Sequence, residues 1–535
     1  MSRTIKDQFA EMDTERHGHL EKARECASLT LPSLLPRLSH NKDDKLSEPF
    51  TTVGTDGVSS LSGAVLGAVF PSNVSFFTVS LSEAVQNNKT ISPEALEAAN
   101  QYLFQTEAIY HAALESSPYK ANENKGYVGF RTAMLQHIQQ GITLGDSLCY
   151  MEDDITFRTF RLPQYVIERD DFGRTLCIIT RENVVAMSLT EEQFRKAKLS
   201  YDQYKTARGP SARTELFTRC QWNHDTKRWV IEQEVNGVVI NTREEAVSPY
   251  FPFYIDLPSG ENYGRGIVER NLGELRGLNE LERRILEFAG MASMGLVVLD
   301  QASNIREDEL TKPPGSILRG VVRDGQVQDM GVFKANNYAD FKVIHDSVIR
   351  KVDQLERRFL RKQGAVRDSE RTTAAEILNV TIPELDAALG NLYAPIADSL
   401  QKPLVARLRV VLEKKNVIAP VPAALKDWIK VEYLTGSAAL SRQQRAQKIL
   451  QFLAVAQQFP PEAQDYINSE MALNVLARYM SVTERGIVHT PEEVANIRNE
   501  RAQREAAVQA QNEINRAAAQ SAGAVATTAA TTPVA

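Results

Sequence analysis

The chain has 535 residues, a formal net charge of −6, 43% hydrophobic residues and 24% charged residues. This balance is typical of a folded protein with room for about three or four domains. The acidic excess argues against tight, sequence-independent binding of nucleic acid over a large surface, which requires many Lys and Arg contacts to phosphates. No apolar run reaches the ~20 residues of a membrane-spanning helix, and no signal peptide is visible. We therefore expect no membrane association and an intracellular compartment.

Metal and disulfide chemistry are not indicated. His17 and His19 in the stretch RHGH could hold a metal, but no Cys or carboxylate completes a ligand set at suitable spacing. A solvated helix end is the favoured interpretation, and we expect no metal and no cofactor. The cysteines are too far apart for a C-x-x-C motif and are expected to be reduced, mostly buried thiols: Cys26, Cys149, Cys177 and Cys220.

The first half of the chain changes from helix to strand. Up to about Ile142 we expect helices with irregular connectors, since Ser92-Pro93-Glu94 is typical of a helix start. From about residue 146 to 256, alternating apolar and polar residues predict strands. Hairpin turns are expected at residues 170–173, 224–225 and 236–237. With the helices that follow, the fold class is α+β, mainly α.

Two amphipathic helices are predicted on either side of a small insertion. The first has an apolar stripe over residues 268–288, which we expect to form one long amphipathic helix. The second stripe covers residues 341–359. The insertion between them reads as strand-like, with a hairpin turning at residues 324–325.

A short basic segment follows the second helix. Residues 357–378 read RRFLRKQGAVRDSERTTAAEIL, with six basic side chains and a glycine in an acidic chain. Thr373 and Glu376 have the spacing of a capping box that restarts a helix, and apolar periodicity then continues to Leu412. Kinks or breaks are predicted at three prolines in this stretch: Pro383, Pro395 and Pro403.

No enzyme motif stands out. Asp171-Phe172-Gly173 matches the magnesium motif of kinases, but no companion motif is present, so a hairpin turn is favoured. The glycines of NYGRGIVERNLG have neither dinucleotide-binding nor Walker A spacing and are better explained by a turn that starts a helix. Acidic pairs such as Asp153-Asp154 are more typical of a solvated loop than of acid–base chemistry. We expect no catalytic residue and no enzymatic activity.

The order of the segments resembles a known family. The stretches that carry the resemblance are LTLPSLLPR, QYVIERDDFGRTLCIITREN, ENYGRGIVERNLGELRGLNELERRI and RTTAAEILNVTIPELDAALGNLYAPIADSLQKPLVARL. With the helical C-terminal part they span nearly the whole chain. They resemble the portal proteins, or head-to-tail connectors, of tailed bacteriophages, and in detail the short-tailed, T7-like branch. Pro383 departs from the unbroken helix expected in that family.

The resemblance implies a portal-type subunit that assembles as a ring, a dodecamer, around a central channel. It divides the chain into a wing (1–261, with a β-rich part at 146–256), two stem helices (262–292 and 339–360), a clip (293–338), a tunnel loop (361–371), a long kinked wing helix and connector (372–436), a helical crown (437–515) and a disordered tail (516–535).

The resemblance also implies a function. Such a ring is the DNA conduit at one capsid vertex, through which the genome is packaged and ejected. The tunnel loop would face double-stranded DNA, with Gly364 as a hinge and Thr373 and Glu376 as the helix cap that follows. The implied partners are a terminase packaging motor, tail adaptor proteins, scaffold and major capsid proteins and internal core proteins, and the location is the portal vertex of the virion after assembly in the host cytoplasm. The DNA-facing residues would be Arg361, Lys362, Arg367 and Arg371.

Other interpretations stay open at this point. A different helical capsid-associated scaffold or a coiled-coil interaction protein is the alternative, although the apolar periodicity lapses at the three prolines. A nucleotide-driven motor would require a Walker A sequence. A basic helix end followed by a solvated loop is also common in proteins that never touch DNA.

Overall fold

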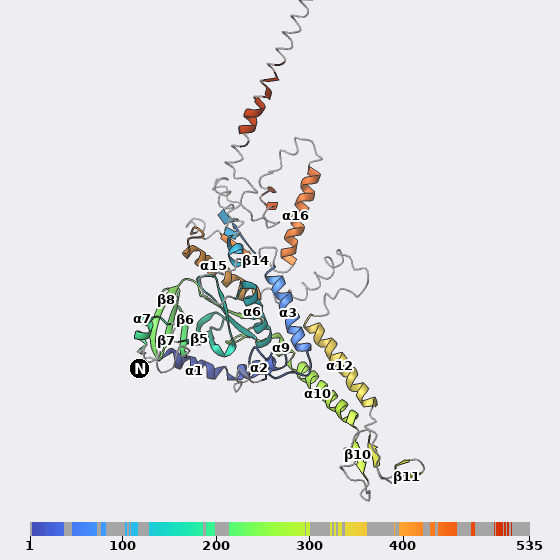
Figure 1. The fold of residues 1–535 in the computed structure, drawn as a ribbon. Helices are drawn as coiled ribbons and strands as arrows, with labels where there is room; N and C mark the ends of the chain where they lie inside the picture. Colours follow the sequence, from blue (N-terminus) through green and yellow to red (C-terminus); the bar gives the residue numbers. More distant parts are fainter. Residues whose placement is uncertain are drawn as a thin grey trace, which may run out of the picture. The chain divides into compact units, whose positions relative to one another are not determined.

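The computed structural model has an α+β fold in which helix predominates, as the sequence predicts. The chain divides into two units, Met1–Ser441 and Arg442–Ala535, and Figure 1 labels many of the helices and strands. Within the described helices, none is both long and apolar enough to cross a membrane. The structure describes residues 3–36, 45–71, 76–81, 102–103, 106–107, 109–115, 128–185, 189–197, 213–294, 296–299, 322–323, 326–327, 330–333, 338–360, 390, 395–420, 429–433, 437–456, 472–473, 475–476, 497, 499–506, 508–509, 511–512 and 515.

Helices of the N-terminal part come first in the chain. They include α1 (Ile5–Glu15), α2 (His17–Ser28), α3 (Val53–Val69) and α6 (Phe130–Leu144). α1 begins at a capping box, in which the Asp7 amide donates to Thr4 Oγ1 and the Thr4 amide to the Asp7 carboxylate. The Ile5 amide also donates to Glu234 Oε2 at 2.6 Å. Since Glu234 is buried in a strand far along the chain, this bond ties the start of α1 to the sheet.

The strands expected between residues 146 and 256 are present and form two antiparallel sheets. The larger sheet is a meander with the order β4-β5-β6-β7-β8. Its strands are Tyr165–Arg169, Thr175–Val185, Arg213–Asn223, Arg228–Val235 and Val238–Glu245. The smaller sheet has the order β3-β2-β9, with β2 at Asp146–Met151, β3 at Phe157–Phe160 and β9 at Tyr250–Tyr254.

The hairpin turns lie where the sequence predicts them. Between β4 and β5, Gly173 has φ +78° and its amide donates to Asp170 O at 2.8 Å. Asn236 and Gly237, with φ +51° and +76°, make the turn between β7 and β8, the pair of positive values that Asn-Gly turns favour. The Asp-Phe-Gly stretch is therefore a turn, and the Phe172 side chain is 83% exposed.

Sequence patterns do not predict one strand pairing. β1 (Phe77–Leu81) pairs with β14 (Ile429–Tyr433) in antiparallel register, with Phe77 opposite Tyr433. The two strands are more than three hundred residues apart, so they share no hairpin turn from which the sequence could predict their pairing.

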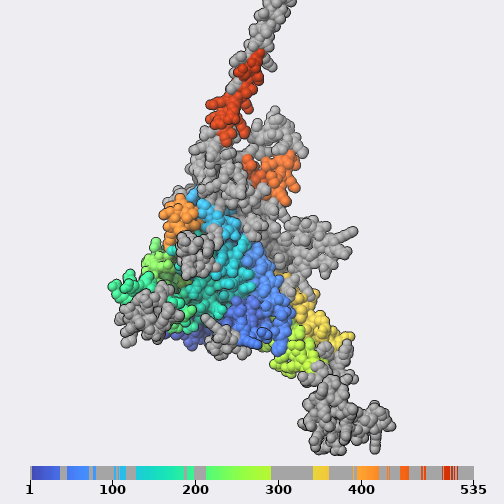
Figure 2. Space-filling view, viewed as in Figure 1, coloured from blue at the N-terminus to red at the C-terminus, as the bar shows by residue number. Residues whose placement is uncertain are grey.

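The two amphipathic helices are present, but the first is interrupted. α9 (Ile267–Arg270) and α10 (Leu272–Met294) are separated at Asn271, whose Nδ2 donates to Ile267 O at 2.9 Å. The prediction of one long helix is wrong at this position, because an Asn side chain competes for backbone groups and favours helix ends. α12 (Tyr338–Arg358) packs against α10 and α3, and Figure 2 shows the atoms of these three helices together.

Short strands are described between α10 and α12. β10 (Leu296–Leu299) pairs with β13 (Met330–Phe333), and β11 (Val322–Arg323) pairs with β12 (Gln326–Val327), both antiparallel. The second pair brackets residues 324–325, where the sequence predicts a hairpin turn. The turn itself lies outside the described residues.

The first unit has a main apolar core and smaller clusters. Elements from distant parts of the sequence share the main core, including α3, α6, α10, α12 and α15 (Lys402–Lys414). A second cluster lies between α2 and the sheets, and a third lies under α1. The four cysteines are free and buried, as the sequence predicts, and burial raises the pKa of each thiol to about 12.

The second unit begins within α16 (Ser437–Ala456). Ala446 and Ala456 of this helix are buried, whereas Leu450, Phe452 and Val455 are exposed. Further helical residues are described between 472 and 515. The predicted disordered tail at 516–535 lies outside the described residues.

Candidate functional site

The residues to which the sequence assigns a role lie outside the described part of the chain. The structure describes both flanks of their segment: the end of α12 before it, and the turn Ala397–Gln401 after it. These two flanks, with the elements that hold them, are the parts of the candidate site with defined geometry. The residues outside, all within 361–389, are Arg361, Lys362, Gly364, Arg367, Arg371, Thr373 and Glu376.

α12 is followed by a buried aromatic residue and a leucine in an uncommon conformation. Phe359 is fully buried and lies against Gly57 of α3, where an added Cβ would be 2.6 Å from Phe359 Cγ. Leu360 has φ +59°, the left-handed region that a leucine adopts rarely. Because only glycine leaves room for the Phe359 ring at position 57, the chain leaves α12 from a fixed point on α3.

Polar contacts hold the last turns of α12 against α10. Lys351 Nζ lies 2.6 Å from Glu274 Oε2, and the hydrogen bond from this lysine holds the Glu274 pKa below its ordinary value. Arg358 Nη1 donates to Asn271 Oδ1 at 3.0 Å. Asn271 therefore has two functions: its amide nitrogen ends α9, and its amide oxygen binds α12.

A π-helical turn lies on the far side of the basic segment, after the described helical residues 395–396. This turn, Ala397–Gln401, leads into α15, which has Pro403 in its first turn. A proline has no amide hydrogen to donate to the preceding turn. The structure accommodates Pro403 by widening that turn, and Ser399 Oγ donates to Pro395 O at 2.7 Å. Pro383 lies outside the described residues.

A buried arginine holds α15 to the sheets. Arg407 is fully buried, with Nη1 3.0 Å from Glu245 Oε2 of β8 and Nη2 2.5 Å from Asp153 Oδ1. Lys414 Nζ lies 2.8 Å from Glu245 Oε1. Burial acts to raise the Glu245 pKa, but the Lys414 hydrogen bond and the Arg407 charge bring it below its ordinary value. Asp153, interpreted from the sequence as part of a solvated loop, is only half exposed and is an ion-pair partner.

The segment that starts α9 crosses the end of α6, backbone against backbone. Gly145 ends α6 with φ +90°, and a Cβ on it would lie 2.3 Å from Gly264 O. A Cβ on Gly266 would lie 2.7 Å from Ile142 O. Gly266 is also the N-cap of α9, so the predicted turn that starts a helix is present. Close backbone packing explains why glycines occupy these positions.

A buried ion pair fixes the same crossing. Asp146 is fully buried, accepts a hydrogen bond from the Tyr165 hydroxyl at 3.1 Å, and lies 3.4 Å from Arg169 Nη2. Arg169 Nε donates to Asn262 O at 3.0 Å. Burial raises the Asp146 pKa to about 6, although the charge of Arg169 and the hydrogen bond from Tyr165 act to lower it. The chain that enters α9 is thus bound to β2 and β4.

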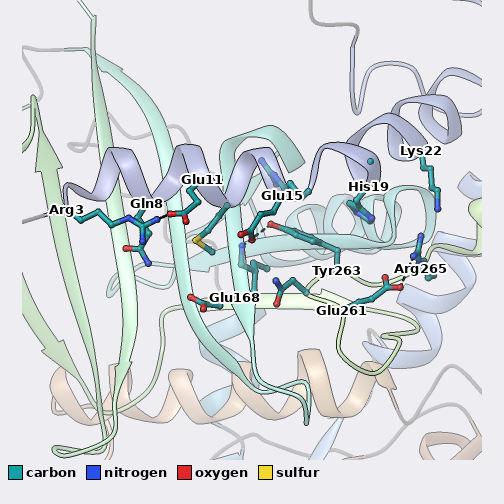
Figure 3. A pocket seen from close by; sticks show the side chains of 15 residues that line it. Arg3, Gln8, Glu11, Glu15, His19, Lys22, Glu168, Glu261, Tyr263 and Arg265 are labelled. Carbon is teal, nitrogen blue, oxygen red and sulfur yellow. Dashed lines mark hydrogen bonds and ion pairs between the residues drawn. The ribbon is translucent and has the colours of Figure 1, made fainter.

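A pocket of about 430 Å³ lies between α1, α2 and the segment that carries Glu261, Tyr263 and Arg265. Figure 3 shows acidic side chains of α1 toward one end and His19 and Lys22 of α2 toward the other. Both signs of charge line the pocket, which therefore favours neither an anion nor a cation.

The two histidines of the RHGH stretch differ in their surroundings. His17 is exposed at the start of α2, as the sequence predicts for a solvated helix end. The same interpretation is wrong for His19, which stacks on the Tyr263 ring with centroids 5.0 Å apart. Burial, with the charges of Arg265 and Arg16, lowers the His19 pKa to about 4. In the described part of the chain, no three His, Cys, Asp or Glu side chains gather as metal ligands.

Comparisons with known proteins cover nearly the whole chain. The family model described as bacteriophage head to tail connecting protein matches residues 2–488. The chain belongs to this connector family. The resemblance identified from the sequence is confirmed.

Curated relatives of this connector agree with the family match. It is 26% identical to the portal protein of Escherichia phage T7 over 501 residues, which cover 91% of this chain and 88% of the relative. The portal protein of Enterobacteria phage T3 is 26% identical over 497 residues, with the same coverage. The portal protein of Pseudomonas phage phiKMV is 26% identical over 461 residues, 84% of each chain. A solved structure, the neck of an empty GTA particle, aligns with 70% of this connector and 88% of that chain at 11% identity, and its TM-score of 0.31 carries no argument.

Sequence reasoning identified the basic segment of this connector but not the residues that hold its flanks. Arg407 lies three residues after Leu404 and four before Val411, on the apolar stripe of α15, and this position was an available signal of burial. Gly57 offered a weaker signal, a glycine within an apolar helix, which often marks close packing.

Proposed function

We propose that this chain is the subunit of a ring-shaped portal at one vertex of a phage capsid, through which the genome is packaged and later ejected. The observation that carries the proposal is the family match over residues 2–488, supported by portal relatives from three short-tailed phages. The role is structural, and the ring is a component of the virion at the head–tail junction. Subunits assemble in the host cytoplasm.

The proposed ring has about twelve copies that close by rotation around a channel. α10 and α12 form the stem, and the strands between them belong to the clip, which meets the terminase packaging motor and later the tail adaptor proteins. Residues 1–261 and 372–436 form the wing, near the scaffold and major capsid proteins. Residues 437–515 form the crown, which faces internal core proteins. The packing of α12 along α10, with short strands between them, supports the stem and clip assignments.

The basic segment contacts double-stranded DNA in this proposal. Its cations touch phosphates without reading bases, and Asp368 and Glu370 weaken the attraction. A conduit has to let the duplex slide, whereas a strongly basic channel would hold it in place. The net charge of −6 fits such a conduit.

The test replaces the four basic residues together with Gln. Folding and ring assembly should stay nearly intact, because exposed substitutions usually change stability by about 0.5 kcal/mol or less each. DNA packaging or retention should fall, with a dependence on ionic strength and not on base sequence. The measurement is the amount of genome packaged and kept by particles assembled with each ring. The residues to change are Arg361, Lys362, Arg367 and Arg371.

A matched variant separates charge from backbone freedom. Gly364→Pro keeps all four cations but restricts the backbone, and it should impair DNA passage without changing the salt dependence. If the four-Gln ring keeps DNA like the parent at every salt concentration, the segment is a solvated loop. A strictly monomeric mass by light scattering across concentrations and salts would contradict the ring itself.

A further inference from the structure

Helix α3 contacts both flanks of the basic segment. Near its start, Gly57 receives the ring of Phe359, the residue that follows α12. At its last residue, Val69 O accepts a hydrogen bond from Gln401 Nε2 at 2.9 Å. Gln401 is the final residue of the π-helical turn and is fully buried. One helix therefore binds the chain where it leaves for the basic segment and where it returns.

The contact at Val69 is directional. The last carbonyls of a helix have no partner within the helix, and the Gln401 amide satisfies one of them at the end of α3. Gln401 Oε1 has no partner among the described residues, so the side chain is held through its nitrogen alone. A hydrogen bond of this kind fixes orientation, whereas the apolar contacts of Leu400 and Leu404 in the core do not.

The separation of the two flanks follows from the length of α3. Gly57 and Val69 are twelve residues apart in one helix, which corresponds to about 18 Å along its axis. The 41 residues between Phe359 and Gln401 could span well over 100 Å if extended, at about 3.3 Å per residue. The length of the connecting chain therefore does not limit the separation, whereas α3 contacts both flanks directly.

We infer that α3 is the spacer that sets the separation of the two flanks of the basic segment, and that Gly57 and Gln401 are its positioning residues. Neither residue touches DNA. They act through Phe359 and Val69, so the inference rests on the proposed function only where DNA retention is concerned. Because each contact joins one flank directly to α3, the loss of either should change the spacing.

The direct test measures the spacing. Spin labels are placed at Arg357→Cys and Lys402→Cys, whose native side chains are 69% and 55% exposed. The four native cysteines are buried and should not label. Labelled subunits are diluted with unlabelled ones, and electron–electron double resonance gives the distance distribution. The parent should show one narrow distribution, and both Gly57→Ala and Gln401→Leu should broaden or shift it.

A matched control exists within the same helix. Gly63→Ala adds the same methyl group to α3 where no atom lies within 4 Å, and it should leave the distribution unchanged. If Gly57→Ala fails to fold, Gln401→Leu still tests the inference. This variant should fold, because it introduces an apolar side chain into an apolar core. A distribution that stays narrow and unshifted in a folded Gln401→Leu variant would overturn the inference.

The functional test uses additivity. The two positions lie about 18 Å apart, so their effects on melting temperature should add. Their effects on DNA retention should not: each single variant should lose as much retained DNA as the double variant. If the losses of retained DNA in the two single variants instead add up in the double variant, as the changes in melting temperature do, the two residues have a merely structural role and the inference is overturned. If retention does not depend on the basic residues at all, the proposed DNA contact of the basic segment fails, while the spin-label result still decides whether α3 sets the spacing.

Discussion

The two ends of α10 differ in what surrounds them. At its start, Leu275 and Leu278 are fully buried, and the chain that enters it crosses α6 beside the Asp146–Arg169 pair. From Glu280 onward the helix has ion pairs between its own exposed or half-exposed side chains, and Leu286 is 57% exposed. Burial makes an ion pair or a backbone contact costly to break, whereas an exposed ion pair contributes little to the free energy of unfolding. Stability should therefore be sensitive to substitution on the buried side and tolerant on the exposed turns.

The largest effect should come from Gly145→Ala. The new methyl group would meet Gly264 O at 2.3 Å, in a backbone conformation with φ +90° that alanine adopts poorly. We expect a loss of more than about 4 kcal/mol of unfolding free energy, or no folded protein, by urea denaturation. Gly260→Ala is the control, because it has φ +78° but no atom within 4 Å, and it should cost only about 1 kcal/mol. Equal losses of unfolding free energy in the two variants would mean that the backbone crossing of Gly145 and Gly264 does not determine stability.

The next largest effect should come from Arg407→Met. This change removes one of the two ion-pair partners that the buried Glu245 carboxylate has among the described residues and leaves Lys414, and breaking a buried pair typically costs about 3–5 kcal/mol. Lys414→Met should lower the unfolding free energy clearly less, since Lys414 is half exposed and Arg407 would still bind Glu245. Denaturant titration of both variants measures the difference, and the opposite order would contradict the role given to Arg407.

Asp146→Asn should change the pH dependence of stability. The folded pKa of about 6 lies above the ordinary 3.8, so the folded chain binds this proton more tightly than the unfolded chain. Stability from this group is therefore full below about pH 4 and is lost as pH rises through 6, by about 3 kcal/mol in total. The Asn variant should lack this component. Parent and variant profiles that run parallel between pH 4 and 7 would show that Asp146 is not the titrating group.

The smallest effect should come from Glu280→Gln on the exposed turns of α10. The change removes ion pairs with Arg283 and Arg284, both between exposed or half-exposed side chains. Unfolding free energy should change by no more than about 0.5 kcal/mol. A loss of several kcal/mol in the same urea titration would show that these turns are as tightly coupled to the core as the start of the helix.

Local patterns in the sequence determined much of the fold. The strands of the two sheets and the turns at Gly173 and Asn236-Gly237 are where alternation and turn residues indicate, because these signals act over a few neighbouring residues. The apolar stripes likewise locate α10 and α12. The order of segments was sufficient to identify the family, since an ordered set of stretches is far more specific than any short motif.

Contacts between distant residues were decided only by the tertiary structure. The pairing of β1 with β14, the backbone crossing at Gly145 and Gly264, and the burial of Arg407 each depend on a partner that lies more than one hundred residues away. At the interruption of the predicted long helix, Asn271 likewise binds a distant residue, Arg358 of α12, which lies 87 residues away. No periodicity or local propensity encodes such a partner. The contact forms because another segment supplies the space and the hydrogen-bonding group. The sequence therefore located the basic segment, and the folded chain determined the separation at which its flanks are held.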